Sequence, residues 1–361
     1  MTLDQPLTPD HLLLALACFF LAIALANSLF FPSLTRRSTA GRVSILIPAR
    51  NEESNLPGCL IAALATDAAE VVVCDDHSTD GTASVVQAFA SIDPRVRLIQ
   101  AGTLPPGWMG KPFACKTLSE SARNPWMLFL DADTHLQPDA TSRMVAECVA
   151  RRLTLLSCWP SLEMESWAER LLMPTLNFVV FSIFPGPLSL FLGSPSLGLA
   201  HGACIMVNQE TYRKLGGHDL VRGEIFEDTR LAQLWRRAGE RGLCVDGRDV
   251  VRVRMYDGFR GIWLGFQKNF YPAFRHGASF VAFLILHGGV FLAAFCFSWR
   301  AAVVILLTRL VLAVRFRHPL FSVVAHPVTE ILLIALGLSS WWRCATGRGV
   351  AWKGRIYKAN A

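Results

Sequence analysis

The stretch WMLFLDAD at residues 126–133 combines two features that decide the fold. Trp126–Leu130 is a short run of apolar and aromatic residues, which is typical of a buried strand. The triplet Asp131-Ala132-Asp133 follows directly, and in an extended chain its two carboxylates lie on the same side. A buried strand that ends in acidic residues indicates an α/β sheet with a ligand site at the carboxyl ends of its strands.

The residues before this stretch alternate between apolar runs and helical patterns. The other predicted strands are Val43–Pro48, Glu70–Cys74 and Val96–Gln100, and the predicted helices are Glu53–Ala65, Gly81–Ser91 and Pro112–Ala122. Strands that alternate with helices predict a mostly parallel sheet with helices on both faces, as in Rossmann-like α/β domains.

Polar motifs follow two of these other strands. Pro48–Glu52 (PARNE) comes directly after the first, and Asp75–Asp80 (DDHSTD) directly after the second. A single motif of this kind is also typical of a turn or a helix cap, and Ser78 and Asp80 suit that role. Three acid-bearing loops at strand ends share one edge of a parallel sheet, so together they predict a site for a cation and an anionic ligand.

The carboxylates of Asp131 and Asp133 suit a hard divalent cation. Mg²⁺ and Mn²⁺ prefer oxygen ligands, and Mg²⁺ is usually held by one or two carboxylates together with substrate phosphates. One carboxylate can ligate the metal directly, while the other reaches it through water or holds a sugar. We therefore expect Mg²⁺ or Mn²⁺ as the cofactor, where it offsets the charge that grows on a departing nucleotide.

The pair Glu227-Asp228 precedes a helical pattern that starts at Thr229. One interpretation is structural, because an Asp at the beginning of a helix caps its amino end. The other is catalytic: Asp228 acts as the general base that takes a proton from an acceptor hydroxyl. An aspartate with an ordinary pKa is already ionised at neutral pH and needs no raised value for this role. The two interpretations are compatible.

Lys111 lies in a turn-like segment between the third strand and the Asp131 strand. The Gly-Lys pair there lacks the Gly-x4-Gly-Lys-Ser/Thr spacing of a P-loop. Two interpretations stay open for Lys111: a solvated turn lysine, or a cation that approaches the phosphates of a bound donor.

The composition places apolar segments at both ends of the chain. Hydrophobic residues make up 52% and charged residues 17% of the 361 residues, whereas a soluble domain carries about 25% charge. His11–Phe31 has no formal charge and is long enough to span a bilayer. A cleaved signal peptide is the alternative, but no basic residue precedes Arg36. A retained anchor followed by Arg36 and Arg37 predicts a catalytic domain in the cytoplasm.

The carboxyl-terminal third contains further apolar stretches. Ala278–Trp299 suits a membrane span, Leu320–Trp342 is long enough for another, and Ala301–Phe316 is short and contains Arg309. Hydropathy allows three spans, whereas the basic residues from Arg343 favour two. The sequence leaves that choice open and predicts a multi-pass protein of the cell membrane.

Two apolar segments inside the chain are interpreted as interfacial. The stretch 167–195 is broken by prolines, and the stretch 257–276 has aromatic residues at helical spacing with basic residues among them, although an ordinary amphipathic core helix is the alternative for the second. The expected regions are an anchor at 1–40, a catalytic domain at 41–256 with its insertion at 167–195, an interfacial segment at 257–276, a transmembrane region at 277–345 and a basic tail at 346–361.

The net charge of +7 is not concentrated in one basic run. Many of the basic residues flank the apolar stretches, a placement that suits anionic lipid headgroups better than nucleic acid. They are Arg36, Arg37, Arg343, Arg348, Lys353, Arg355 and Lys358. We expect a membrane and no nucleic acid among the partners.

Taken together, these motifs resemble glycosyltransferase family 2, whose enzymes have the GT-A fold. The family's P-x-x-N-E, D-D-x-S-x-D, DxD and late E-D patterns match Pro48–Glu52, Asp75–Asp80, Asp131–Asp133 and Glu227–Asp228. The resemblance implies a nucleotide-sugar site and an inverting transfer with Asp228, beside Glu227, as the catalytic base. The residues implied to bind the nucleotide sugar are Pro48, Ala49, Arg50, Glu52, Asp76, Asp131 and Ala132, with Asp133 and Asp131 on the metal. Lys111 stays a further candidate for the donor phosphates because of its position. The Gln-x-x-Arg-Trp signature of processive members is absent, and Gln267 and Lys268 occupy a similar place as weak candidates for acceptor or phosphate contacts.

A narrower resemblance rests on Leu104–Cys115 (LPPGWMGKPFAC) and Arg348–Tyr357 (RGVAWKGRIY). Both look like segments of bacterial membrane-bound glucosyltransferases that act on carotenoid and hopanoid lipids. The resemblance implies a UDP-sugar donor, with a hexose such as glucose transferred from UDP-glucose to a hydroxyl of a membrane lipid. The alternatives are a polyprenyl-phosphate or polysaccharide glycosyltransferase, and a non-catalytic membrane scaffold that binds nucleotide sugar.

Overall fold

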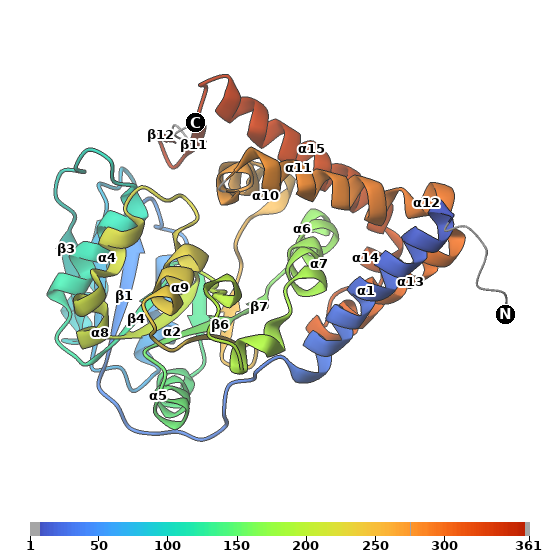
Figure 1. The fold of residues 1–361 in the computed structure, drawn as a ribbon. Coiled ribbons are helices and arrows are strands. Elements are labelled where there is room, and N and C mark those ends of the chain that lie inside the picture. Colours follow the sequence, from blue (N-terminus) through green and yellow to red (C-terminus); the bar gives the residue numbers. More distant parts are fainter. Residues whose placement is uncertain (1–7, 275, 358–361) are drawn as a thin grey trace. The chain divides into compact units, whose positions relative to one another are not determined.

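The computed structural model describes residues 8–274 and 276–357, and the chain divides into two compact units (Figure 1). The first, here called the sheet unit, comprises Pro32–Glu163 and Leu188–Met255. The second, here called the helical unit, comprises Met1–Phe31, Met164–Pro187 and Tyr256–Ala361. The predicted tail residues beyond Tyr357, with Lys358, lie outside the described residues.

The sheet unit is built on a seven-stranded sheet in the order β3-β2-β1-β4-β8-β6-β9. Within it β8 runs antiparallel to both of its neighbours, β4 and β6, and the other pairings are parallel. The strands are β1 (Val43–Ala49), β2 (Glu70–Asp75), β3 (Val96–Gln100), β4 (Trp126–Leu130), β6 (Leu155–Trp159), β8 (Cys204–Asn208) and β9 (Gly242–Asp246). The prediction of a mostly parallel α/β sheet is confirmed.

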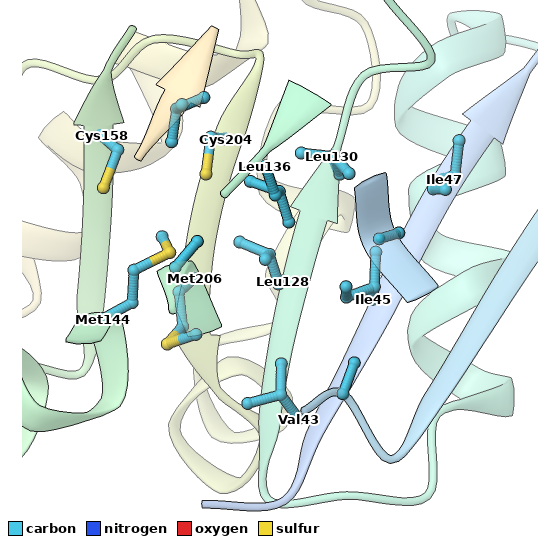
Figure 2. Close-up of a cluster of buried hydrophobic side chains, with 14 of the residues drawn as sticks. Val43, Ile45, Ile47, Leu128, Leu130, Leu136, Met144, Cys158, Cys204 and Met206 are labelled. Atoms are coloured by element: carbon cyan, nitrogen blue, oxygen red, sulfur yellow. The ribbon is translucent and has the colours of Figure 1, made fainter. Parts of the chain in front are cut away.

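Helices cover both faces of this sheet because successive strand residues point to opposite sides. Val43, Ile45 and Ile47 of β1 lie in one buried cluster with Leu128 of β4, as Figure 2 shows, whereas Leu46 belongs to the cluster on the other face. The first face packs against α2 (Leu56–Leu64), α3 (Thr82–Ile92) and α5 (Ala140–Arg151), and the second against α4 (Gly110–Ser121), α8 (Gln209–Leu215) and α9 (Glu227–Arg237).

A smaller sheet continues from the acidic triplet. It has the order β5-β10-β7, formed by β5 (Thr134–Leu136), β10 (Val251–Val253) and β7 (Ser161–Leu162). Because β5 begins directly after Asp133, pairing with β10 fixes the backbone on the far side of the triplet. The Arg254 amide also donates to the Asp133 carbonyl at 3.4 Å.

The helical unit contains three helices that are long and apolar enough to cross a membrane, among the residues that the structure describes. They are Pro9–Phe30, Gly277–Phe297 and His326–Ala345, which agrees with apolar spans at both ends of the chain. The middle one is irregular and consists of α11 (Gly277–Leu286), the π-helix η5 (His287–Leu292) and α12 (Ala294–Phe297). The other elements are α6 (Trp167–Leu172), α7 (Pro174–Ile183), α10 (Gly258–Asn269), the 3₁₀ turn η4 (Tyr271–Ala273), α13 (Trp299–Phe316), α14 (Phe321–Val324) and the hairpin β11–β12 (Val350–Trp352 and Arg355–Tyr357).

The Arg309 segment, whose membrane placement the sequence leaves open, forms α13. This helix packs along α1 (Pro9–Phe30), and it is not among the three membrane-length apolar helices. Arg309 is buried, and its guanidinium donates to the carbonyl oxygens of Pro174 at 3.4 Å and Ser322 at 3.2 Å. These bonds satisfy the charged group inside an otherwise apolar packing.

The predicted insertion at 167–195 is divided between the two units. Its first part forms α6 and α7 in the helical unit, whereas residues from Leu188 onward belong to the sheet unit. The boundary falls within η1 (Gly186–Leu190), and η2 (Pro195–Leu197) follows in the sheet unit. There the Arg236 guanidinium of α9 donates to the Ser194 carbonyl at 3.0 Å. The proline-rich sequence therefore marks a crossing from one unit to the other.

Candidate active site

The loops that follow β1 and β2 are joined by hydrogen bonds at the carboxyl edge of the sheet. The Asp76 amide donates to the Ala49 carbonyl at 2.8 Å, and the Asn51 amide donates to the Ser78 hydroxyl at 2.9 Å. In return, Asn51 Oδ1 accepts from the Thr79 amide at 2.8 Å. The two predicted motifs therefore form one connected surface.

Several polar side chains in these loops have structural partners. Asp75 is buried and accepts from the Ser78 amide at 3.0 Å and from Gln100 Nε2 at 3.1 Å. Asp80 accepts from the amide of Thr82, the first residue of α3, at 3.0 Å. Asp80 therefore satisfies an amide at the beginning of α3 from the position before the N-cap residue, Gly81.

Arg50, Glu52 and Asp76 of these loops were predicted to lie at the nucleotide site, and they make different contacts with the neighbouring loops. The Arg50 guanidinium donates to the carbonyl oxygens of Asp76 and His77, the latter at 3.1 Å, so it holds the two loops together. The Glu52 amide donates to Thr82 Oγ1 at 2.8 Å. Asp76 is buried, at 5% exposed.

Lys111 joins the two acidic motifs of the candidate site. Its Nζ lies 2.8 Å from Asp131 Oδ1 and 3.1 Å from Asp131 Oδ2, so it contacts both oxygens of that carboxylate. The same Nζ lies 3.1 Å from Glu227 Oε1. Burial opposes the charge of Lys111, but these two carboxylates outweigh burial and hold its pKa well above its ordinary value. Of the two interpretations for Lys111, the solvated turn lysine is wrong.

Asp228 lies in the first turn of α9, as the helical pattern predicts. It is half-buried, and its Oδ1 accepts from the Thr229 amide at 2.6 Å. Burial, and next the negative charge of Glu227, raise the pKa of Asp228 to about 7. The expectation of an ordinary pKa is therefore wrong, because the sequence does not show the burial and the neighbouring charge that disfavour ionisation.

A third contributor, which the sequence did not predict, is the loop His201-Gly202 that leads into β8. A Cβ atom added at Gly202 would lie 3.0 Å from Asp228 Oδ2 and 3.2 Å from Lys111 Nζ. Glycine at this position therefore lets the backbone approach the two charged groups closely. The available signal was a Gly-x-x-His-Gly pattern directly before an apolar run, which is weak by itself.

His201 fixes the same loop from the buried side. Its amide donates to the Ser157 hydroxyl at 2.8 Å, its Nδ1 accepts from the Ala203 amide at 3.3 Å, and its ring packs edge-on against Trp159. Burial lowers the pKa of His201 to about 4, against the attraction of Asp131. His201 is therefore neutral near pH 7 and positions the loop without adding charge to the site.

The acidic residues fit a hard divalent cation with few protein ligands. Within the described part of the chain, no group of three or more His, Cys, Asp or Glu side chains is arranged to hold a metal ion. Lys111 contacts both oxygens of Asp131, and the half-buried Asp133 accepts a 3.3 Å hydrogen bond from the Thr134 hydroxyl at Oδ1. Such a site suits Mg²⁺ or Mn²⁺ that takes one carboxylate from the protein and its other ligands from a diphosphate and water.

The remaining predicted residues contribute differently. The side chains of Ala49 and Ala132 are part of the buried apolar core, so any contact that they make with a donor is through the backbone. Gln267 and Lys268 lie on α10 in the helical unit, where Gln267 Nε2 donates to Ser339 Oγ and the Gln267 carbonyl accepts from Ser340 Oγ at 2.7 Å. Gln267 therefore links α10 to α15 (His326–Ala345).

The mostly parallel sheet with its antiparallel β8, the small sheet after the acidic triplet and the acid-bearing strand ends define a domain of the GT-A glycosyltransferase fold. Residues 44–216, slightly less than half of the chain, match the family described as glycosyl transferase family 2.

Relatives of known name extend this similarity. The chain is 28% identical over 247 residues to 4,4'-diaponeurosporenoate glycosyltransferase of Staphylococcus haemolyticus, an alignment that covers 67% of this chain and 64% of that protein, slightly less than two thirds of its length. It is 25% identical over 343 residues to the protein of the same name from Staphylococcus aureus, with 88% of each covered. A mannosyltransferase from Pyrobaculum calidifontis, solved with GDP-Man and Mn²⁺, superposes with a TM-score of 0.53 at 22% identity and covers 91% of this chain and 99% of that one. That last similarity supports the fold.

Proposed function

We propose that this protein is a membrane-bound, metal-dependent glycosyltransferase that moves a hexose from a nucleotide sugar to an oxygen of an apolar, carotenoid-like membrane lipid. The observation that carries the proposal is the contact of Lys111 with both Asp131 and Glu227, beside Asp228 and Gly202. This arrangement brings the donor-binding motif and the candidate catalytic base, Asp228, together at one edge of the sheet.

The donor side of the reaction uses the edge formed by β1, β2 and β4. Asp133 would hold the cation together with the donor diphosphate, and the metal would supply Lewis-acid stabilisation of the leaving nucleotide. Lys111 neutralises Asp131, which lets an anionic diphosphate approach a motif rich in carboxylates. We assign nucleotide contacts to Pro48, Arg50 and Asp76 by the family resemblance, with UDP-glucose as the preferred donor.

The acceptor side uses the first turn of α9. Asp228 takes the proton of the acceptor hydroxyl as its oxygen attacks the anomeric carbon from the face opposite the leaving group, which inverts that centre. A carboxylate with a pKa near 7 is a stronger base than an ordinary aspartate and is still half ionised at neutral pH. Because Gly202 has no side chain, no Cβ atom lies against Asp228 Oδ2, which supports access of a hydroxyl to that oxygen.

The lipid acceptor is inferred from the relatives and from the apolar helices. Both staphylococcal relatives are named for a carotenoid substrate, and three helices of this chain are long and apolar enough to cross a membrane. Arg36 and Arg37 follow the first of them, which by the positive-inside rule supports a sheet unit on the cytoplasmic side. We therefore propose a multi-pass cell-membrane enzyme whose acceptor arrives from the bilayer.

The test is nucleotide release by the purified full-length protein in detergent. A panel of nucleotide sugars is supplied with Mn²⁺ or Mg²⁺, with and without a carotenoid-containing lipid extract. Lipid-stimulated release that Asp228→Asn abolishes supports the proposal, whereas release stimulated by polyprenyl phosphate and insensitive to Asp228→Asn assigns a phosphate acceptor, which needs no strong base. No turnover with any donor indicates a non-catalytic scaffold.

A further inference from the structure

A cavity of about 240 Å³ with a mixed polar and apolar lining lies in the sheet unit, at the edge opposite the candidate active site. Four arginines, one glutamate and one asparagine contribute the polar groups of its wall: Arg42, Arg95, Arg97, Arg123, Glu70 and Asn124. None of these residues belongs to the nucleotide-sugar site described above.

The parallel sheet explains why these residues meet. Arg42 directly precedes β1, Glu70 begins β2, Arg97 lies near the beginning of β3 and Asn124 lies just before β4. Parallel strands bring their amino ends to one edge, and the candidate active site uses their carboxyl ends. The seven residues of β1 span roughly 20 Å, so the cavity is a separate site.

Two of the four arginines are already neutralised by acidic neighbours. Arg97 Nη2 lies 2.7 Å from Glu70 Oε2, and Arg95 Nη2 lies 2.9 Å from Asp93 Oδ2. Burial works against the ionised form of Glu70, but hydrogen bonds from Ser44 and Arg97 hold its pKa below the ordinary value. Both acidic partners are therefore ionised at neutral pH.

Arg42 and Arg123 keep their charge without such a partner. Both are exposed, and neither has a carboxylate within 4.0 Å among the residues that the structure describes. The cavity therefore has two positive charges that no protein group offsets. A charge of this kind lowers the free energy of a bound anion more than that of a neutral ligand.

Glu70 holds the residues around it in the cavity wall through hydrogen bonds. Its Oε1 accepts from Ser44 Oγ at 2.7 Å, from the Arg123 amide at 2.8 Å and from Asn124 Nδ2 at 3.2 Å. The backbone that carries Arg123 is thereby tied to the beginning of β2. A site whose supporting residues are held before binding loses less conformational entropy when it binds.

We propose that this cavity binds a phosphate group, held by the guanidinium groups of Arg42 and Arg123. A guanidinium presents paired N–H donors that match two phosphate oxygens, and the two arginines together balance a phosphate dianion. The cavity is several times larger than the roughly 30 Å³ share of one water, so it accommodates the phosphate and part of an attached group. The phosphate comes either from a soluble anion or from a phospholipid headgroup.

Binding is measured on the full-length protein in neutral detergent, from the ligand-dependent rise in its unfolding temperature. The probes are inorganic phosphate and short-chain dihexanoyl phosphatidic acid, with dihexanoyl phosphatidylcholine as the lipid control. Arg42→Ala with Arg123→Ala is compared with Arg213→Ala with Arg237→Ala, which removes the same charge from exposed positions on α8 and α9.

The proposal predicts that the apparent Kd of the stabilising probe rises about a hundredfold in the Arg42/Arg123 variant, roughly tenfold for each charge-assisted contact, and stays unchanged in the Arg213/Arg237 variant. Arg42→Lys with Arg123→Lys keeps the charge and gives an intermediate Kd. A response to phosphatidic acid alone identifies a headgroup, and a response to both probes identifies a soluble phosphate site. An equal response of the Arg42/Arg123 variant and the wild type, or no response of the wild type to either probe, overturns the proposal.

Discussion

The two edges of the central sheet carry opposite chemistry. At the carboxyl edge, the carboxylates of Asp131 and Glu227 meet at a single lysine, Lys111, whereas at the amino edge arginines gather around a single glutamate, Glu70. In each case the isolated group of opposite sign joins side chains from different loops. The comparison teaches that the two ends of parallel strands can carry sites for ligands of opposite charge. Here the length of the strands separates the proposed cation site from the proposed phosphate site.

The largest expected effect comes from Asp133→Ala. Loss of the carboxylate that we propose for the cation should lower kcat/KM for donor turnover by about a thousandfold or more, and chelation of the metal should give the same loss in the wild type. Nucleotide release measured over a range of Mn²⁺ concentrations checks both. Asp219→Ala, at an exposed acid of the same unit, is the control, and full activity of Asp133→Ala would remove the cation from the carboxyl edge.

Asp228→Asn tests the base at the same edge. The amide cannot accept the acceptor proton, so kcat falls by roughly a hundredfold to ten-thousandfold while the KM for the donor changes little. Steady-state kinetics with varied donor and lipid check this, with Asp219→Asn as the matched variant. An equal loss in donor affinity and kcat would instead assign Asp228 to donor binding.

The pH dependence sharpens the role of Asp228. With a pKa of about 7, this group is mostly protonated at pH 6 and mostly ionised at pH 8, so wild-type kcat/KM rises about tenfold across that interval. The folded-state pKa lies above the unfolded value of about 3.9, so the contribution of this group to stability is present below pH 4 and lost as the pH rises through 7. Asparagine at position 228 does not ionise, so Asp228→Asn avoids this loss of stability. Thermal unfolding at pH 8 should show the variant at least as stable as the wild type.

Lys111→Met probes the lysine that joins the acids. The change leaves Asp131 and Glu227 close together without the lysine charge that they share. We therefore expect a loss of about a hundredfold in kcat/KM and a destabilisation of about 1–2 kcal/mol. The destabilisation is smaller than for a fully buried ion pair because the Lys111 side chain is 38% exposed. Denaturant unfolding and nucleotide release measure the two effects. Lys214→Met, at an exposed lysine, should change neither, and unaltered kinetics of Lys111→Met would show that the contact serves folding alone.

The smallest expected effect comes from Gly202→Ala. The added methyl group lies at the limit of contact with Asp228 and Lys111, so those side chains must shift by a few tenths of an ångström. We expect about a tenfold loss in kcat with near-normal unfolding temperature, because the reacting groups lose alignment while the fold is retained. Gly193→Ala, where the added atom meets open space, is the control.

The sequence correctly predicted those features that depend on residues adjacent in the chain. The bounds of β3 and β4 agree with the predicted strands, and the acidic motifs do lie at strand ends, because strand hydrophobicity and its following loop are adjacent in the chain. His201 and Gly202 were missed because β8 brings their loop beside Asp131 from a distant part of the sequence. The raised pKa of Asp228 depends on burial and on Glu227 acting together in three dimensions, and the division of 167–195 between two units depends on packing rather than on local hydropathy.

The most direct test of the proposed reaction is mass spectrometry of the lipid fraction after incubation of the purified protein with a nucleotide hexose, Mn²⁺ and a carotenoid-containing extract. We predict a lipid product heavier by one hexose residue with the wild type, and none with Asp133→Ala or Asp228→Asn. Nucleotide release without any hexosylated lipid, or an equal yield of product from both variants, would contradict the assignment of the Lys111-linked acids to sugar transfer.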